Sequence, residues 1–380
     1  MSEKEGVLSR ELEARGVSRR DFMKYCGVVA AMIGLDVTAA PQIAAALDNA
    51  AKLKPVIWLE GGSCSGCTES TAQSDNPDLA TIVLSLISLN YTETVMAAAG
   101  YAAEQAKADT IAAGGYILVY EGSVMTAYDG EVFMIGGKTG LEDLKEAAAK
   151  ADAIVAVGSC AVDGGWVAAA PNPGGATGVG PYLATQGINK PVVNLPTCPV
   201  NPVWVVATLV DVLMLGKVPE LDEVGRPKAI FGETIHDNCP RRGRFENGEF
   251  VYQFGSEEEA KGYCLYAMGC KGPQTKTNCP IVRWNKKQSW CVESGAPCIG
   301  CGNPSWVDHD APFLRRMRDL PVAGGVQPVV FGLGAAGVVA AGLAVHGLGM
   351  KAAGRTGRVG VPTEELKEYD RKHGSKGGDQ

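Results

Sequence analysis

Residues 55–70 have the sequence PVIWLEGGSCSGCTES, an apolar run followed by a glycine-rich loop that holds Cys64 and Cys67. An apolar run followed by a cysteine occurs twice more, in ADAIVAVGSC, which ends at Cys160, and in KPVVNLPTC, which ends at Cys198. Short runs rich in β-branched residues are typical of buried parallel strands. Loops at the carboxyl ends of parallel strands meet at one edge of a sheet, so we expect these four cysteines to converge there.

The pattern from residue 51 to 218 predicts alternating strands and helices. We expect strands at residues 56–60, 116–120, 153–157 and 192–195, and helices at residues 95–113, 141–150 and 203–215. Such alternation is typical of an α/β fold and indicates a flavodoxin-like doubly wound parallel sheet. Residues 219–320 lack this periodicity, so they are predicted to form an irregular second domain that depends on its metal centres for stability.

Eleven of the 12 cysteines lie between Cys64 and Cys301. Together with His236 they form three groups of four, and four ligands are what one iron-sulfur cluster requires. The first group is the set expected at the sheet edge. The second consists of His236, Cys239, Cys264 and Cys270, and the third of Cys279, Cys291, Cys298 and Cys301.

Other uses of these thiols remain open. Structural zinc sites also take four thiolates, or three and an imidazole, but their ligands usually come as two close pairs, unlike Cys160 and Cys198. Disulfides are a second possibility for an exported protein. The alternative functions are a zinc-stapled, membrane-anchored interaction protein and an FMN-binding flavodoxin-like redox protein. Thiols in the first loop, where a phosphate-binding loop has amides and hydroxyls, weigh against the flavin.

Chain length and net charge limit the number of domains and the kinds of partner to expect. The 380 residues, of which 46% are hydrophobic, are enough for two domains with a substantial core. A formal net charge of −7 gives no support to a nucleic-acid surface, so no nucleic-acid partner is expected.

Residues 1–50 are predicted to be a signal peptide of the twin-arginine type. Residues 18–24, SRRDFMK, contain the arginine pair and precede a stretch of small and apolar residues. Cleavage is expected between Ala40 and Ala50, so Cys26 would leave with the signal. The protein is therefore expected in the periplasm or on the outer face of the cytoplasmic membrane.

Residues 329–350 contain no Asp, Glu, Lys or Arg, and about 20 such residues cross a bilayer as a helix. We expect a single transmembrane anchor here, followed by a polar tail over residues 351–380. A glycine-rich buried core helix is the alternative. His346 lies inside this stretch and is a candidate neighbour of a partner's haem, although it also lies close enough to the end to reach the interface.

The chain resembles the small subunit of nickel-iron hydrogenases over about residues 54–312. The resemblance rests on WLEGGSCSGCTES, VYEGSV, VGSCAVDGGWVAAAPNPGGATGV, LPTCPVNP, FGETIHDNCPRR, GCKGP and PCIGC, in matching order and spacing. It implies a protein without a catalytic residue of its own, which docks on a large subunit that holds the nickel-iron site. Electrons from hydrogen oxidation, a reversible reaction, would pass through three clusters to a membrane cytochrome b or a periplasmic cytochrome c.

The resemblance also assigns the ligands. Cys64, Cys67, Cys160 and Cys198 match the ligands of a proximal 4Fe-4S cluster, and the group with His236 matches a distal 4Fe-4S cluster. The third group matches the medial cluster. Many family members have proline where this chain has Cys291, and hold a 3Fe-4S cluster. Four thiolates predict a medial 4Fe-4S cluster instead, as in small subunits of nickel-iron-selenium enzymes, and 3Fe-4S if Cys291 is not a ligand.

Two glycines near the first cysteine group and three glutamates near strand ends give further expectations. Oxygen-tolerant relatives carry extra cysteines where this chain has Gly66 and Gly165, so their type of proximal cluster is not expected. Glu60, Glu69 and Glu121 lie near strand ends that face the expected partner. They are candidates for proton movement or partner binding, with ordinary surface carboxylates as the alternative.

Overall fold

The structure is a computed structural model of the full chain. It describes residues 54–75, 77–79, 82, 87–214, 216–315 and 328–353, and scattered positions within 18–44 and 364–372. Two compact units are present, Met1–Met317 and Arg318–Gln380. Each unit is considered by itself.

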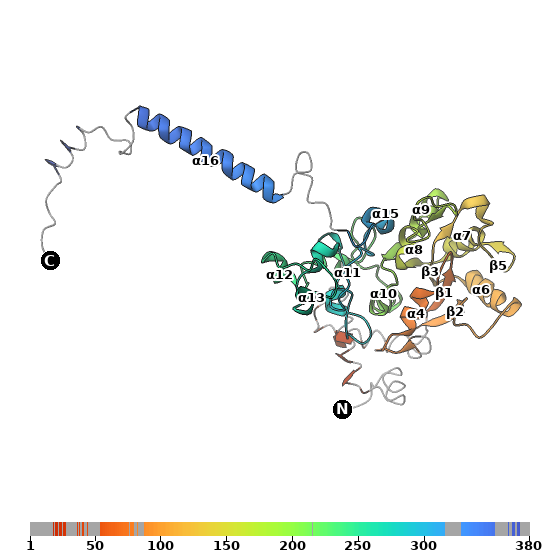
Figure 1. Cartoon of the computed structure of the whole chain (residues 1–380). Coiled ribbons are helices and arrows are strands. Elements are labelled where there is room, and N and C mark those ends of the chain that lie inside the picture. Colours follow the sequence, from red (N-terminus) through yellow and green to blue (C-terminus); the bar gives the residue numbers. More distant parts are fainter. Residues whose placement is uncertain are drawn as a thin grey trace. The chain divides into compact units, whose positions relative to one another are not determined.

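A five-stranded sheet forms the centre of the first unit (Figure 1). Its strands are β1 (Pro55–Glu60), β2 (Ser88–Thr92), β3 (Ile117–Glu121), β7 (Ala153–Val157) and β9 (Val192–Leu195), in the order β2-β1-β3-β7-β9. Every neighbouring pair is parallel. The predicted parallel α/β sheet is therefore confirmed, while its flavodoxin-like assignment stays a prediction.

Alternating side chains of the strands enter two separate apolar cores. In β1, Val56 and Trp58 belong to one core and Ile57 and Leu59 to the other, and all four are buried. This period of two follows from the pleat of a strand, and a sheet covered on both faces needs apolar residues at every position. Each such buried side chain contributes roughly 1.5–3 kcal/mol of hydrophobic free energy.

The helices around the sheet begin close to where the pattern predicts. The larger ones are α6 (Tyr101–Ala113), α7 (Gly140–Lys150) and α10 (Pro202–Met214). Helix α7 starts at a capping box, in which the Thr139 hydroxyl accepts from the Glu142 amide and the Glu142 side chain accepts from the Thr139 amide. The helix expected from residue 95 begins only at Tyr101, because Gly100 with φ +57 precedes it.

Several elements were not predicted. Strand β2 was not predicted because its sequence, SLNYT, is mostly polar, as is common for a strand at the edge of a sheet. Two short helices, α4 (Gly66–Ala72) and α8 (Gly158–Asp163), directly follow β1 and β7 and carry Cys67 and Cys160. The remaining small elements of this part are β4 (Val124–Met125), η3 (Ala127–Gly130), β5 (Met134–Ile135), β6 (Lys138–Thr139), β8 (Ala176–Thr177) and α9 (Val179–Thr185).

Residues 216–315 contain short helices and isolated β-bridges. The helices are α11 (Lys228–Phe231), α12 (Arg242–Glu246), α13 (Glu257–Ala260), η4 (Leu265–Met268), η5 (Gly272–Gln274), α14 (Cys279–Val282) and α15 (Trp306–Asp310). Because these helices are short, most of the backbone of this part lies in loops. These loops carry most of the second and third cysteine groups.

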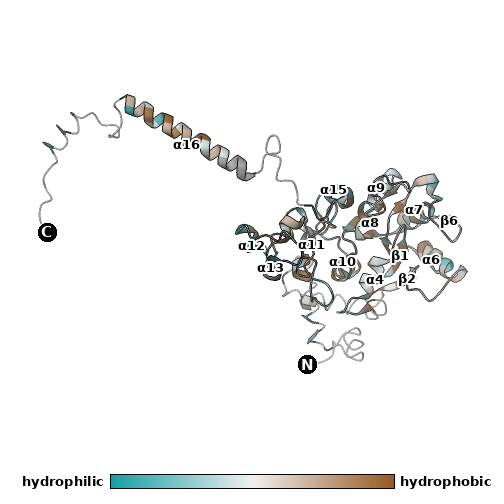
Figure 2. Cartoon of the chain, viewed as in Figure 1, coloured by the Kyte–Doolittle hydropathy of each residue, from teal (hydrophilic) through white to brown (hydrophobic). Residues whose placement is uncertain are grey.

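Helix α16 (Pro328–Ala352) lies in the second unit. Its segment Gly334–Ala352 is long and apolar enough to cross a membrane, and it is not buried within the structure. Figure 2 shows apolar colouring along much of this helix. Length and composition are weak evidence by themselves, but they agree with the predicted anchor.

Near the amino terminus, the described residues around the arginine pair include a helix start. The Ser18 hydroxyl accepts from the Asp21 amide at 3.2 Å and donates to the Asp21 carboxylate at 2.6 Å. This reciprocal arrangement is typical of a helix N-cap. Most of the expected signal peptide, including its cleavage region beyond residue 44, lies outside the described residues.

Candidate functional site

The first cysteine group lies at the carboxyl edge of the sheet. Cys64 follows β1, Cys67 lies in α4, Cys160 lies in α8 after β7, and Cys198 follows β9. Cys67 interacts electrostatically with Cys160 and Cys198, and both of these interact with Cys64. The structure therefore brings the four predicted residues together. Cys64 and Cys198 are exposed, so this group opens to the surface.

Glu121 at the end of β3 holds the first loop in place. Its carboxylate accepts from the amides of Cys67 and Thr68, both at 2.9 Å, and from the Thr68 hydroxyl at 2.6 Å. It also accepts from the Ser63 hydroxyl at 3.1 Å and from the Trp58 indole at 3.3 Å. Only 2% of this residue is exposed. The surface alternative considered for Glu121 is thus wrong, because its carboxylate is an internal anchor.

Two glycines let the backbone pass close to the thiols. A Cβ at Gly158 would lie 2.4 Å from the Cys67 sulfur, and one at Gly165 would lie 3.0 Å from the Cys160 sulfur. Both glycines have positive φ, +84 and +47, which side chains with a Cβ rarely adopt. A side chain at either position would therefore collide with one of these cysteines and strain the backbone.

The second group lies in the loops between α11 and η5. Cys264 interacts electrostatically with Cys239 and Cys270, so these three thiols are neighbours. His236 is joined to Cys239 through the backbone, since the Cys239 amide donates to the His236 carbonyl at 3.3 Å. The His236 ring packs edge-on against Phe245, 4.6 Å between ring centres. Burial, helped by Arg242, lowers the pKa of His236, which favours the neutral imidazole that metals bind.

The third group includes Cys291. Cys279 interacts electrostatically with Cys291, and Cys301 interacts with both of them and with Cys298. The Thr277 hydroxyl donates to the Cys279 sulfur at 3.0 Å. Cys291 thus lies with the other three members of its group and not apart from them.

Hydrogen bonds join the three groups in a row. The Ser159 hydroxyl, next to Cys160 in the chain, donates to the Cys301 carbonyl at 2.7 Å, and Cys301 interacts electrostatically with Cys198. These contacts connect the first group with the third. The Cys298 amide donates to the Cys270 sulfur at 3.3 Å, which connects the third group with the second. The third group therefore lies between the other two.

The thiols are held in surroundings that oppose their ionisation. Burial raises the pKa of Cys198 and Cys264 to about 11 and of Cys279 to about 12, and it raises the pKa of Cys67 and Cys298 well above the ordinary value. Only a cation close to sulfur can make such thiols lose their protons near neutral pH. Metal binding at these groups would therefore release protons.

The distances between the ligands of a site depend on whether it holds one metal ion or a cluster. Within the described residues, no three His, Cys, Asp or Glu side chains converge on one point as ligands of a single ion would. A zinc ion needs all its ligand atoms about 2.0–2.3 Å from one centre. In an iron-sulfur cluster each sulfur ligand binds a different metal atom, so its four ligands lie farther apart than those of one zinc ion.

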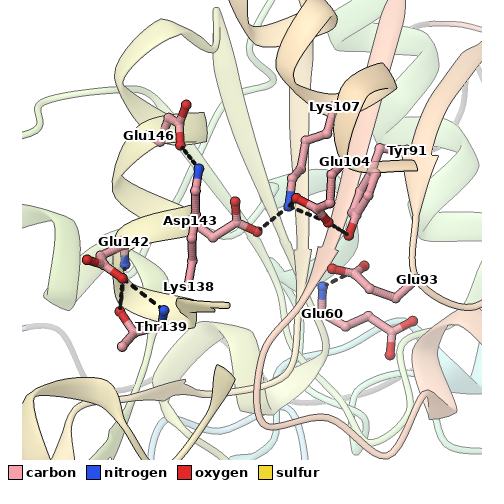
Figure 3. Close-up of polar contacts among 10 residues, drawn as sticks. All are labelled: Glu60, Tyr91, Glu93, Glu104, Lys107, Lys138, Thr139, Glu142, Asp143 and Glu146. Carbon is pink, nitrogen blue, oxygen red and sulfur yellow. Dashed lines mark hydrogen bonds and ion pairs between the residues drawn. The ribbon is translucent and has the colours of Figure 1, made fainter. Parts of the chain in front are cut away.

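Next to Glu60 lies a network of charged residues that includes Glu93, Lys107 and Asp143 (Figure 3). Glu93 accepts from the Glu60 amide at 3.2 Å, while Lys107 is paired with Asp143 at 2.7 Å and Glu104 at 3.0 Å. Burial, together with Glu60 and Asp143, raises the pKa of Glu93 to about 8, although Lys107 opposes the shift. Glu60 donates its backbone amide to this network and accepts from the Ser65 hydroxyl at 3.0 Å, whereas Glu69 is exposed.

Glu93→Gln is expected to stabilise the folded protein at alkaline pH. The folded protein holds the Glu93 proton up to about pH 8, whereas the unfolded chain releases it near 4.5, so stability is lost as the pH rises through this interval. We expect the melting temperature of the variant to exceed that of the parent by about 2–4 °C at pH 9 and to equal it near pH 5. Glu146→Gln, at an exposed pair with Lys138, is the control and should show no such trend. An equal difference at both pH values would refute the buried-acid explanation.

The comparisons with known proteins agree along the whole body of the chain. Residues 64–212 match the family "NADH ubiquinone oxidoreductase, 20 Kd subunit", and residues 231–314 match the family of the C-terminal region of the NiFe/NiFeSe hydrogenase small subunit. The periplasmic NiFe hydrogenase small subunit of Solidesulfovibrio fructosivorans is 46% identical over 81% of this chain and 96% of its own length. The small chain of the quinone-reactive Ni/Fe-hydrogenase of Wolinella succinogenes is 43% identical over 85% and 90%.

Solved structures give the same result. The reduced, active Ni-Fe-Se hydrogenase of Desulfomicrobium baculatum contains a chain 37% identical to this one, with a TM-score of 0.66. The match covers 70% of this chain and 100% of that chain. Identity of this level over most of the length, together with the sheet and cysteine arrangement described above, places this chain in the family of nickel-iron hydrogenase small subunits, the electron-transfer partners of the large hydrogenase subunit.

Proposed function

We propose that this protein holds three iron-sulfur clusters and relays electrons between the nickel-iron site of the large subunit and an external acceptor. The proximal 4Fe-4S cluster has the ligands Cys64, Cys67, Cys160 and Cys198. The medial 4Fe-4S cluster has Cys279, Cys291, Cys298 and Cys301, and the distal 4Fe-4S cluster has His236, Cys239, Cys264 and Cys270. Bound clusters of this kind accept and pass on single electrons.

The observation that carries this proposal is the linear arrangement of the three groups. The Ser159–Cys301 and Cys298–Cys270 hydrogen bonds bring each group next to the following one. The first group is open to the surface at Cys64 and Cys198, which suits docking of a large subunit there. Glu121 orients the first loop, and the glycines at 158 and 165 let the backbone pack closely against Cys67 and Cys160.

The Cys239→Ala variant is expected to impair electron relay and to leave catalysis at the large subunit intact. Loss of a distal ligand should lower hydrogen-dependent reduction of an external dye at least about tenfold, because the exit from the relay is damaged. Exchange of hydrogen with deuterated water needs only the nickel-iron site, so it should persist. Both rates are measured on the purified heterodimer, with Glu146→Gln, at an exposed ion pair with Lys138, as a control outside the three groups. Equal loss of both activities in an intact heterodimer, or no loss of dye reduction, would contradict the relay.

The domains and location follow the same proposal. Residues 1–50 act as a twin-arginine signal, residues 51–218 hold the proximal cluster in a flavodoxin-like domain, and residues 219–320 hold the other two. Helix α16 anchors the protein to the membrane, with the body outside. A membrane cytochrome b that reduces quinone is the favoured acceptor, since the Wolinella succinogenes relative is named quinone-reactive. A periplasmic cytochrome c is the second candidate.

Removing residues 318–380 tests the anchor. The truncated heterodimer should move from the membrane fraction to the periplasmic fraction, while hydrogen-dependent dye reduction per heterodimer stays within about twofold of the parent. Fractionation followed by activity staining measures both quantities. Retention of the truncated protein in the membrane would show that another segment or a partner provides the attachment.

A further inference from the structure

Lys271 is a buried lysine where the second and third cysteine groups meet. Only 4% of it is exposed. It directly follows Cys270 in the chain, and its amide donates to the Cys298 carbonyl at 2.7 Å. Its own carbonyl accepts from the Thr275 hydroxyl at 2.8 Å. The backbone of Lys271 is thus fixed between one member of each group.

The Lys271 side chain is fixed as well. Its ammonium donates to the Arg315 carbonyl at 3.0 Å. The ammonium interacts electrostatically with Cys270 and Cys298, one from each group, and with Asp310. A buried cation is costly unless negative groups surround it, and thiolates bound to metal would supply such charge here.

Asp310 is an acidic residue that interacts electrostatically with Lys271. Its oxygens accept from the Asn303 amide at 3.0 Å, from the Gln274 amide and from the His309 ring at 2.8 Å. Asp310 is also buried, with 3% exposed. Among the described residues no ion pair joins the Lys271 ammonium to this carboxylate, so the ammonium lies near the sulfurs without a directly bonded counter-ion.

We propose that the buried ammonium of Lys271 is an electrostatic tuning residue that raises the reduction potentials of the medial and distal clusters together. This inference rests on the proposed function, since it assumes that both groups hold clusters. Adding an electron makes a cluster more negative by one charge, and a nearby fixed cation favours that state. The effect would draw electrons away from the proximal end and towards the exit.

Lys271→Met removes the charge and keeps most of the side chain's length. At a fixed ambient potential, the ratio of reduced to oxidised medial and distal clusters should fall about tenfold, a shift of about 59 mV for one electron. The proximal cluster should be unchanged. Redox titration of the anaerobically purified heterodimer, followed by spin-resonance spectroscopy of each cluster, measures the three potentials. Lys271→Arg keeps the charge and should retain the potentials of the parent.

Lys107→Met is the matched control, because Lys107 is also buried but pairs with Asp143 and Glu104. It should move neither the medial nor the distal potential. Lys271→Gln gives the same comparison if the methionine variant does not assemble. Unchanged potentials in a charge-removing variant, an equal shift of all three clusters, or the same shift in Lys271→Arg would overturn the proposal. Absence of the clusters from the parent protein would instead refute the proposed function.

Discussion

Replacing Glu121 with alanine is expected to remove the proximal cluster and to lower hydrogen-dependent dye reduction at least about 100-fold. Five hydrogen bonds from the first loop and its surroundings end on this one carboxylate. A hydrogen bond to a buried charged group contributes about 1.5–3 kcal/mol, and the alanine variant would leave two buried backbone amides without an acceptor. The loop that holds Cys64 and Cys67 would then have no fixed position.

The measurement combines activity, iron content and spin-resonance spectra of the purified heterodimer. The variant should lose about four iron atoms, and the medial and distal signals should remain, which distinguishes a local effect from general unfolding. Glu121→Gln, which keeps one carbonyl oxygen, should have an intermediate effect. Glu60→Gln is the matched control, since this nearby carboxylate accepts from the Ser65 hydroxyl and not from a cysteine amide. Full iron content and activity in the alanine variant would show that Glu121 does not hold the loop.

Cys291→Ala is expected to convert the medial cluster from 4Fe-4S to 3Fe-4S. The structure places Cys291 within electrostatic range of Cys279 and Cys301, so the loss of one thiolate removes one iron from a site that otherwise stays formed. The oxidised variant should give a strong 3Fe-4S spin-resonance signal that the parent lacks, and iron should fall from about 12 to about 11 atoms per small subunit.

The same variant should also have a higher medial potential, because 3Fe-4S clusters of this family lie at higher potential. Glu146→Gln is again the control and should leave the spectrum of the parent unchanged. Two results would contradict the assignment of Cys291. One is a 3Fe-4S signal already present in the parent, and the other is a variant with unchanged iron and spectrum.

The central fold could be predicted because its strands are simple. β7, with the sequence AIVAV, is buried at every position and bounded by turn residues, and the prediction matches its limits. β2 could not be predicted in this way, because SLNYT has only two apolar residues, Leu89 and Tyr91, and is defined by its pairing with β1. The helix limits that were wrong, as at Tyr101, depend on the backbone conformation of a single glycine.

The candidate site was predictable to a similar extent. Cysteine spacing grouped the thiols, because strand ends determine where loops meet. Glu121 was noticed but its role was not predicted, since hydrogen bonds between residues 54 positions apart cannot be read from local sequence. The position of Lys271 between two cysteine groups and the Ser159–Cys301 bond were missed for the same reason. Only the GCKGP motif, with a lysine next to a cysteine, gave a signal that could have drawn attention to Lys271.

Iron and acid-labile sulfide in the anaerobically purified heterodimer test the central claim most directly. Three 4Fe-4S clusters predict about 12 iron atoms and about 12 sulfides in the small subunit, with spin-resonance signals of three reduced centres after exposure to hydrogen. About three zinc ions without sulfide, or cysteines joined in disulfides, would contradict the account.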